Sequence, residues 1–148
     1  MTNAETWNAN YERVQKARKE LGQINKAAIF AALAAAGIEL VLVTFDGEGD
    51  SGQIEDVTAG RNDQSVDLPD AKVTLLQASW DKADPDISEV DLREAIETLC
   101  YDFLEEDHGG WENNDGAFGE FRLDVAARTV ELEFNFRYTD TFTTNLTY

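Results

Sequence analysis

The strongest constraint on the fold lies near the end of the chain, where apolar and polar residues alternate along two segments. Phe121, Leu123 and Val125 alternate with polar residues, and the alternation resumes over residues 130–138 after a short Ala-Ala-Arg connection. A period of two places successive side chains on opposite faces of a strand. Two such runs predict an antiparallel hairpin with one buried face. Residues 139–148 show no clear pattern, and we expect an edge strand or a tail there.

Helical periodicity predicts two helices at the start of the chain. Residues 4–21 carry apolar side chains at i, i+4 and i+7 spacing, and the alanine-rich segment 23–36 follows Gly22. Glycine is unfavourable in a helix interior, so Gly22 predicts a break between the two helices. Gly37 is expected to end the second one.

A third helix is expected from Ser88 to about Asp107. Ser88 is a typical N-cap residue, Asp91 occupies the capping-box position, and an apolar stripe follows at helical spacing. His108 and the following glycine pair are expected to end this helix.

Further strands are expected between these helices. Residues 38–45 are apolar at most positions, which is typical of a central strand buried on both faces. A polar turn and a returning strand at residues 53–57 should follow, and then a polar loop over 59–71. Residues 73–76 predict a third strand, with a short helix as the alternative, and residues 81–86 a linker.

The predicted fold is therefore one α+β domain spanning residues 1–148. It has a helical part, 1–36, and an acidic sheet-helix-hairpin part, 37–148. Two N-terminal helices and one later helix are expected to pack on a mainly antiparallel sheet of four to five strands.

Charge is distributed unevenly along this domain. The whole chain has a formal net charge of −18, yet residues 1–36 carry five basic and three acidic side chains. The negative charge therefore comes from residues 37–148. Hydrophobic residues make up 43% of the chain, which excludes a disordered acidic tail. The acidity disfavours direct binding of nucleic acid or of an anionic membrane, because both require basic side chains. A basic protein surface is the expected partner.

The later helix provides the first candidate site. Acidic side chains three or four residues apart share a helix face, about 5–6 Å from one another, and that spacing is comparable to the spacing of DNA phosphates. We expect these carboxylates to bind the nucleic-acid channel of a host nuclease, CRISPR or restriction effector as a DNA mimic, with Glu131 and Glu133 extending the surface. The alternatives are an ordinary solvated helix face and a general adaptation to high salt. The candidate partner-binding residues are Asp91, Glu94, Glu97, Asp102, Glu105 and Glu106.

Two glycine-rich loops provide a second candidate site, for a metal or another ligand. Asp46, Glu48 and Asp50 alternate with glycines and have the oxygen donors that calcium prefers. However, Val57 stands where an EF-hand loop has its glutamate, and a solvated turn explains the same residues. The loop from His108 to Gly116 contains the only histidine, but the preferred interpretation is a helix end followed by a structured loop, with Trp111 covering the core edge.

No catalytic motif is present, so we expect a non-enzymatic protein without a cofactor. Cys100 is the only cysteine and is interpreted as a small core residue, which fits the cytoplasm. The apolar run 27–36 is too short to cross a membrane. A third hypothesis is a subunit of a larger assembly that docks through its basic helix 4–21.

Two segments also carry a family resemblance: residues 45–57, with the string GDSGQIE, and residues 95–124, with the string HGGWENNDGA-G. Over about residues 38–138 the chain resembles a family of uncharacterised small acidic bacterial proteins, often carried on plasmids and other mobile elements. The resemblance implies no activity and no functional residues. It does favour roles useful to mobile DNA, such as blocking host defence.

Overall fold

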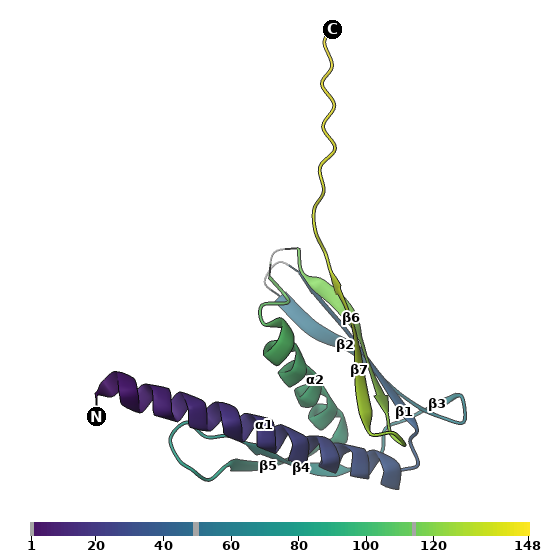
Figure 1. Cartoon of the computed structure of the whole chain (residues 1–148). Helices are drawn as coiled ribbons and strands as arrows, with labels where there is room; N and C mark the ends of the chain where they lie inside the picture. Colours follow the sequence, from purple (N-terminus) through teal and green to yellow (C-terminus); the bar gives the residue numbers. More distant parts are fainter. Residues whose placement is uncertain (1, 49–50, 114) are drawn as a thin grey trace.

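A computed structural model describes residues 2–48, 51–113 and 115–148 and shows the predicted α+β fold (Figure 1). The larger sheet is antiparallel and has five strands in the order β3-β2-β1-β6-β7, and a second sheet has the two strands β4 and β5. In chain order the elements are α1 (Asn3–Ala35), β1 (Leu40–Glu48), β2 (Ser51–Arg61), β3 (Gln64–Val66), β4 (Lys72–Gln77), β5 (Asp86–Asp91), α2 (Leu92–His108), β6 (Ala117–Asp124) and β7 (Thr129–Phe136).

Helix α1 is continuous, so the predicted break at Gly22 is wrong. A capping box starts the helix: the hydroxyl of Thr2 accepts a hydrogen bond from the Glu5 N–H, and the Glu5 carboxylate accepts one from the Thr2 N–H. A glycine costs a helix only about 1 kcal/mol relative to alanine. The tertiary contacts of the buried residues Val14 and Phe30, on either side of Gly22, outweigh that cost.

Strand β1 lies at the centre of the larger sheet, between β2 and β6. Its side chains alternate strictly: Val41, Val43 and Phe45 are buried, whereas Leu40 and Leu42 remain partly exposed. The prediction of a strand buried on both faces is therefore wrong. Both helices lie on one side of the sheet (Figure 1), so the outer face remains in contact with solvent.

The small sheet confirms one prediction and corrects two others, and the larger sheet corrects a third. β4 confirms the third strand over the helical alternative, and the predicted linker 81–86 leads into strand β5, which pairs antiparallel with β4. Ser88 consequently lies in a strand, and α2 begins at Leu92 with Asp91 as its N-cap residue. The predicted loop 59–71 contains the end of β2 and the short strand β3.

α1 is tied to the small sheet by polar contacts. The side chain of Asn25 accepts a hydrogen bond from the N–H of Leu76 and donates one to its carbonyl oxygen, both at 2.9 Å. Nearer the start of the helix, the Arg13 guanidinium donates to the carbonyl oxygens of Ser79, Trp80 and Lys82. These bonds fix the helix across the β4–β5 pair.

The hairpin prediction is confirmed by β6 and β7, which pair antiparallel with Phe121 opposite Leu132. The core lies between this sheet and the helices, and Cys100 is buried within it as expected. Residues 139–148 have no regular secondary structure and extend away from the body of the molecule (Figure 1). Among the described residues, no helix is long and apolar enough to span a membrane.

Candidate acidic binding surface

Helix α2 positions the acidic side chains because its opposite side is anchored in the core. Leu92, Ile96 and Leu99 are buried, and the Tyr101 hydroxyl accepts a hydrogen bond from the Ile54 N–H of β2 at 2.8 Å. The helix is therefore held against the inner face of the sheet, and its remaining side faces solvent.

The six predicted residues do not form one uniform surface. Asp91 precedes the helix and forms an ion pair with Lys72 of β4. Glu97 is half-buried and receives a hydrogen bond from Arg93 at 3.2 Å. Both carboxylates therefore already have a basic partner within the chain.

The other four predicted residues form what we call the α2 acidic stripe: Glu94, Asp102, Glu105 and Glu106. All four are exposed. Within the described part of the chain, four ion pairs form, and none includes a residue of this stripe. The α2 acidic stripe thus presents carboxylates that repel one another and are available to a basic partner.

The surroundings of Asp102 shift the pKa of its carboxyl group, and desolvation contributes most to the shift. Although the residue is exposed, neighbouring groups partly desolvate its carboxylate, and this raises its pKa. The positive charge of Arg18 of α1 opposes the increase, and the negative charge of Glu106 adds a smaller one. The ionised form of Asp102 is therefore less favoured than it is for an ordinary, fully solvated aspartate. A cationic group brought next to it would lower its pKa again.

Glu131 and Glu133 do not extend the stripe, and this part of the prediction is wrong. They alternate along β7 with Leu132 and Phe134, which pack against the core that α2 covers. Their side chains must therefore lie on the outer face of the sheet, away from α2.

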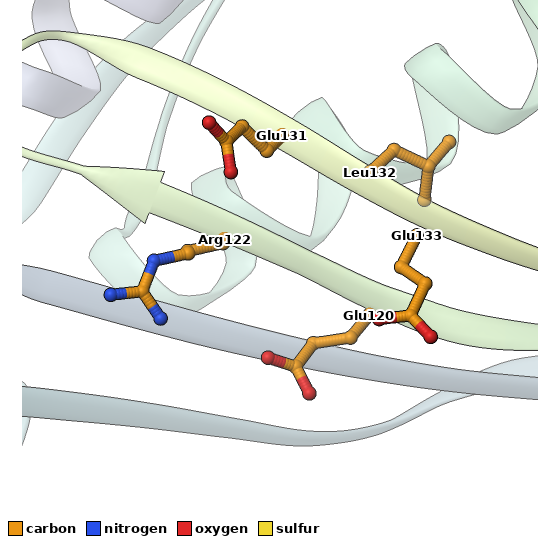
Figure 2. Close-up of a pocket in the computed structure, with 5 residues that line it drawn as sticks. All are labelled: Glu120, Arg122, Glu131, Leu132 and Glu133. Carbon is orange, nitrogen blue, oxygen red and sulfur yellow. The ribbon is translucent and has the colours of Figure 1, made fainter.

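The outer face of the sheet has a shallow hollow that was not predicted from the sequence. The side chains of Glu120, Arg122, Glu131 and Glu133 project from β6 and β7 around it (Figure 2). Glu120 lies directly opposite Glu133, and Arg122 lies opposite Glu131. Like charges in directly opposed positions destabilise a sheet. The alternating pattern of the hairpin was the signal that could have placed these four residues on one face.

The metal-binding alternative gains no support from the first loop. The Arg137 guanidinium binds the Asp46 carboxylate through two hydrogen bonds, of 2.8 and 2.9 Å. Glu48 is exposed at the end of β1, and Asp50 lies outside the described residues. Among the described residues, no group of three or more His, Cys, Asp or Glu side chains is arranged to hold a metal ion.

The second loop packs against the first through Trp111. This side chain is 5% exposed and meets Phe45 edge-on, with 5.3 Å between ring centroids, so that it covers the core edge as expected. Gly47 and Gly52, paired across β1 and β2, leave the space that the indole occupies. His108 stacks on Phe134, with ring centroids 3.9 Å apart. The glycine-rich strings thus have a packing role.

Helix α1 also has an exposed aromatic cluster that was not predicted from the sequence. Trp7 and Tyr11 stack on the surface of α1 with ring centroids 5.3 Å apart, and Trp80 from the β4–β5 loop approaches Trp7 at 5.8 Å. All three side chains are more than 40% exposed. The i, i+4 spacing of Trp7 and Tyr11 was the available signal.

Comparison with known proteins places this arrangement in a family. No curated protein and no solved structure matches the chain. A family model described as "Family of unknown function (DUF6878)" matches residues 21–148. This range includes every strand, all of α2, and the Trp111 contact with Gly47 and Gly52. The chain therefore belongs to this family of unknown function, DUF6878.

Proposed function

We propose that this protein is a non-enzymatic binding protein whose α2 acidic stripe docks on a basic, nucleic-acid-binding surface of another protein. The observation that carries the proposal is the set of four exposed carboxylates on one helix, without an ion-pair partner among the described residues. A helix held rigidly against a sheet presents these charges at a fixed spacing. Such an array resembles a phosphate backbone more closely than charges on a flexible tail would.

The same surface suggests the class of partner. Opposite charges accelerate encounter and select partners with complementary potential. The resemblance to acidic proteins of plasmids and other mobile elements favours a host nuclease, CRISPR or restriction effector, whose channel binds DNA through basic side chains. Binding there would make the protein a DNA mimic that acts in the cytoplasm.

Capture from a host lysate tests this proposal. The immobilised full chain is incubated with lysate at low salt, eluted with a salt gradient, and competed with duplex DNA. We expect basic nucleic-acid-binding proteins that elute at moderate salt and are displaced by DNA. Partners that are insensitive to both salt and DNA would contradict the DNA-mimic proposal.

Two charge-matched variants locate the surface. Glu94→Gln/Asp102→Asn/Glu105→Gln removes three charges from the α2 acidic stripe and should abolish most of the DNA-competed capture. The control, made in Glu120, Glu131 and Glu133 with glutamine at each position, removes the same charge from the outer sheet face and should bind like the wild type. The reverse result would move the binding surface to the sheet.

A further inference from the structure

The last ten residues of the sequence lie extended in solvent, although their side chains are not those of a solvated tail. Phe142 is 94% exposed, Leu146 is 69% exposed and Tyr148 is fully exposed. Five of the ten residues 139–148 are threonine, and none is glycine or proline. This composition favours strands and lacks the residues that keep a tail flexible.

The alternation of β7 continues through this segment in the same phase. From residue 129 to residue 148, every odd-numbered position is polar. The even-numbered positions are apolar or aromatic except for Asp140 and Thr144. Val130, Leu132 and Phe134 of β7 pack against the core, and Phe136 meets Phe134 edge-on with ring centroids 4.7 Å apart. Residues 129–148 therefore have the pattern of one long strand with a single apolar face, of which only the first half is paired.

β7 provides an open edge for such a strand. It is the last strand in the order β3-β2-β1-β6-β7. The N–H of Arg137, just beyond β7, donates to the carbonyl oxygen of Gly116 at 2.9 Å, on the β6 side. In a regular strand the even-numbered residues then direct their N–H and C=O groups toward the open edge. At the same edge Phe136 is 70% exposed, so both backbone and apolar groups are available there.

The segment is poorly suited to fold back on its own β7. The shortest hairpin loop that keeps the apolar faces together has three residues, 139–141. Such loops place their last residue in the left-handed region, and here that residue would be Thr141, a β-branched residue for which this conformation is a marked outlier. The Thr139 hydroxyl also donates to the Asp115 carboxylate at 2.8 Å, which directs the chain outward.

We propose that residues 139–148 add as an antiparallel strand to the open edge of β7 in a second copy of this chain, and that the exchange is reciprocal. A two-fold axis at Thr139 puts the apolar side chains of both strands on the same face of the joined sheet. It places Phe142 opposite Phe136 of the second copy, and Leu146 opposite its Leu132. The added strand would extend each five-stranded sheet by one strand and cover the exposed apolar edge.

The charges along the segment permit pairing with a second copy despite the overall acidity of the chain. Residues 139–148 contain a single charged side chain, Asp140, in a chain with 30 acidic residues. In the proposed register Asp140 lies opposite Tyr138, and Asn145 and Thr147 lie opposite Glu133 and Glu131. No like charges are directly opposed. Repulsion between the two acidic bodies remains, and salt would screen it.

Sedimentation equilibrium of the full chain over a range of concentration and salt tests the proposal. We expect a dimer whose dissociation constant falls as salt rises. Phe142→Ser/Leu146→Ser should raise the dissociation constant at least about tenfold, because it removes two apolar contacts from each exchanged strand. Thr143→Ser/Thr147→Ser, on the polar side of the same segment, should change it little.

Cross-linking tests the register. Across the proposed interface, odd-numbered residues of the two copies would face each other in non-hydrogen-bonded pairs, with Cα atoms about 4.5 Å apart. This distance is within reach of a disulfide. Thr139→Cys should therefore form a covalent dimer on oxidation, whereas Thr141→Cys, which would lie opposite Arg137 of the second copy, should not. A chain that stays monomeric at all concentrations and salts would overturn the proposal. A dimer that the Phe142→Ser/Leu146→Ser variant leaves intact would do so too.

Discussion

The contact of Trp111 with two glycines makes a quantitative prediction about stability. A Cβ atom added to Gly52 would lie 2.6 Å from Cη2 of Trp111 and 2.8 Å from Cβ of Glu112. Carbon atoms in contact prefer separations of about 3.5–4.0 Å, so the new methyl group would overlap the indole by about 1 Å. Gly52→Ala should therefore destabilise the fold by overpacking.

The size of the effect depends on whether Trp111 can move. Its indole is almost completely buried and packs against Phe45 in the core, so moving it would also disturb that contact. Overpacking of this kind typically costs about 1–3 kcal/mol. In a domain of this length, each kcal/mol lowers the melting temperature by about 2–4 °C.

Urea denaturation, monitored by circular dichroism, measures this change in the free energy of unfolding. Gly22→Ala is the matched control, because a Cβ atom there would meet nothing within 4 Å and the residue lies inside α1. It should stabilise the protein by up to about 1 kcal/mol. The same type of substitution should thus have opposite effects at the two glycines.

A double-mutant cycle identifies the cause. In a Trp111→Leu background the clash is relieved, so Gly52→Ala should cost much less there than in the wild type. We expect a coupling free energy of about 1 kcal/mol or more, as for other residues in direct contact. If Gly52→Ala left the free energy of unfolding unchanged, or if the two substitutions were additive, the packing argument would be wrong.

Three further predictions concern single side chains. The pKa of Asp102 is raised above its ordinary value of 3.8, first by burial and also by Glu106. Ionisation of this carboxyl group therefore lowers the stability of the fold as the pH rises above 3.8. Asp102→Asn should raise the melting temperature at pH 7 but not near pH 3. Burial raises the pKa of the Cys100 thiol, so a thiol reagent should react with it only at the rate at which the protein opens. Asn25→Ala should cost about 1–3 kcal/mol in urea denaturation, because it leaves the backbone groups of Leu76 without partners.

Short-range periodicity predicted the elements whose pattern and packing agree. The alternation around Phe121 and Leu132 predicted the hairpin, because one face of β6 and β7 is buried and the other is not. The apolar stripe of α2 was also predicted correctly, because it is the side that packs in the core. In both cases each local preference coincides with the tertiary environment.

The errors occurred where a local signal was weaker than a tertiary one. Gly22 predicted a break, but buried residues on both sides hold α1 together. Ser88 and Asp91 resembled a capping box, but residues 86–91 pair with β4, which lies outside the four residues that a capping box spans. A strand that depends on such a partner is not determined by its own residues alone.

The candidate site was predicted in part for the same reason. Helical spacing correctly placed Glu94, Asp102 and Glu105 on one exposed side of α2. The sequence could not show that Asp91 pairs with Lys72, because that contact depends on the β4–β5 register. The position of Glu133 on the opposite face did follow from its alternation with core residues, and this inference was missed.

Dimerisation through residues 139–148 and binding through the α2 acidic stripe should depend on salt in opposite ways, and the symmetry of the dimer connects the two interactions. Pairing even-numbered with even-numbered residues keeps the apolar faces of both copies on one side, so the two-fold axis must stand perpendicular to the sheets. Both copies of α2 would then lie on the same side of the joined sheets, and the α2 acidic stripe would be presented twice. Two linked sites can bind an extended basic surface more tightly than either site alone. Salt should strengthen the dimer and weaken its contacts with a basic partner. At one low salt concentration, the wild type should therefore capture more of the basic partner than the Phe142→Ser/Leu146→Ser variant does. This difference should become smaller at low protein concentration, where the wild type also dissociates into monomers.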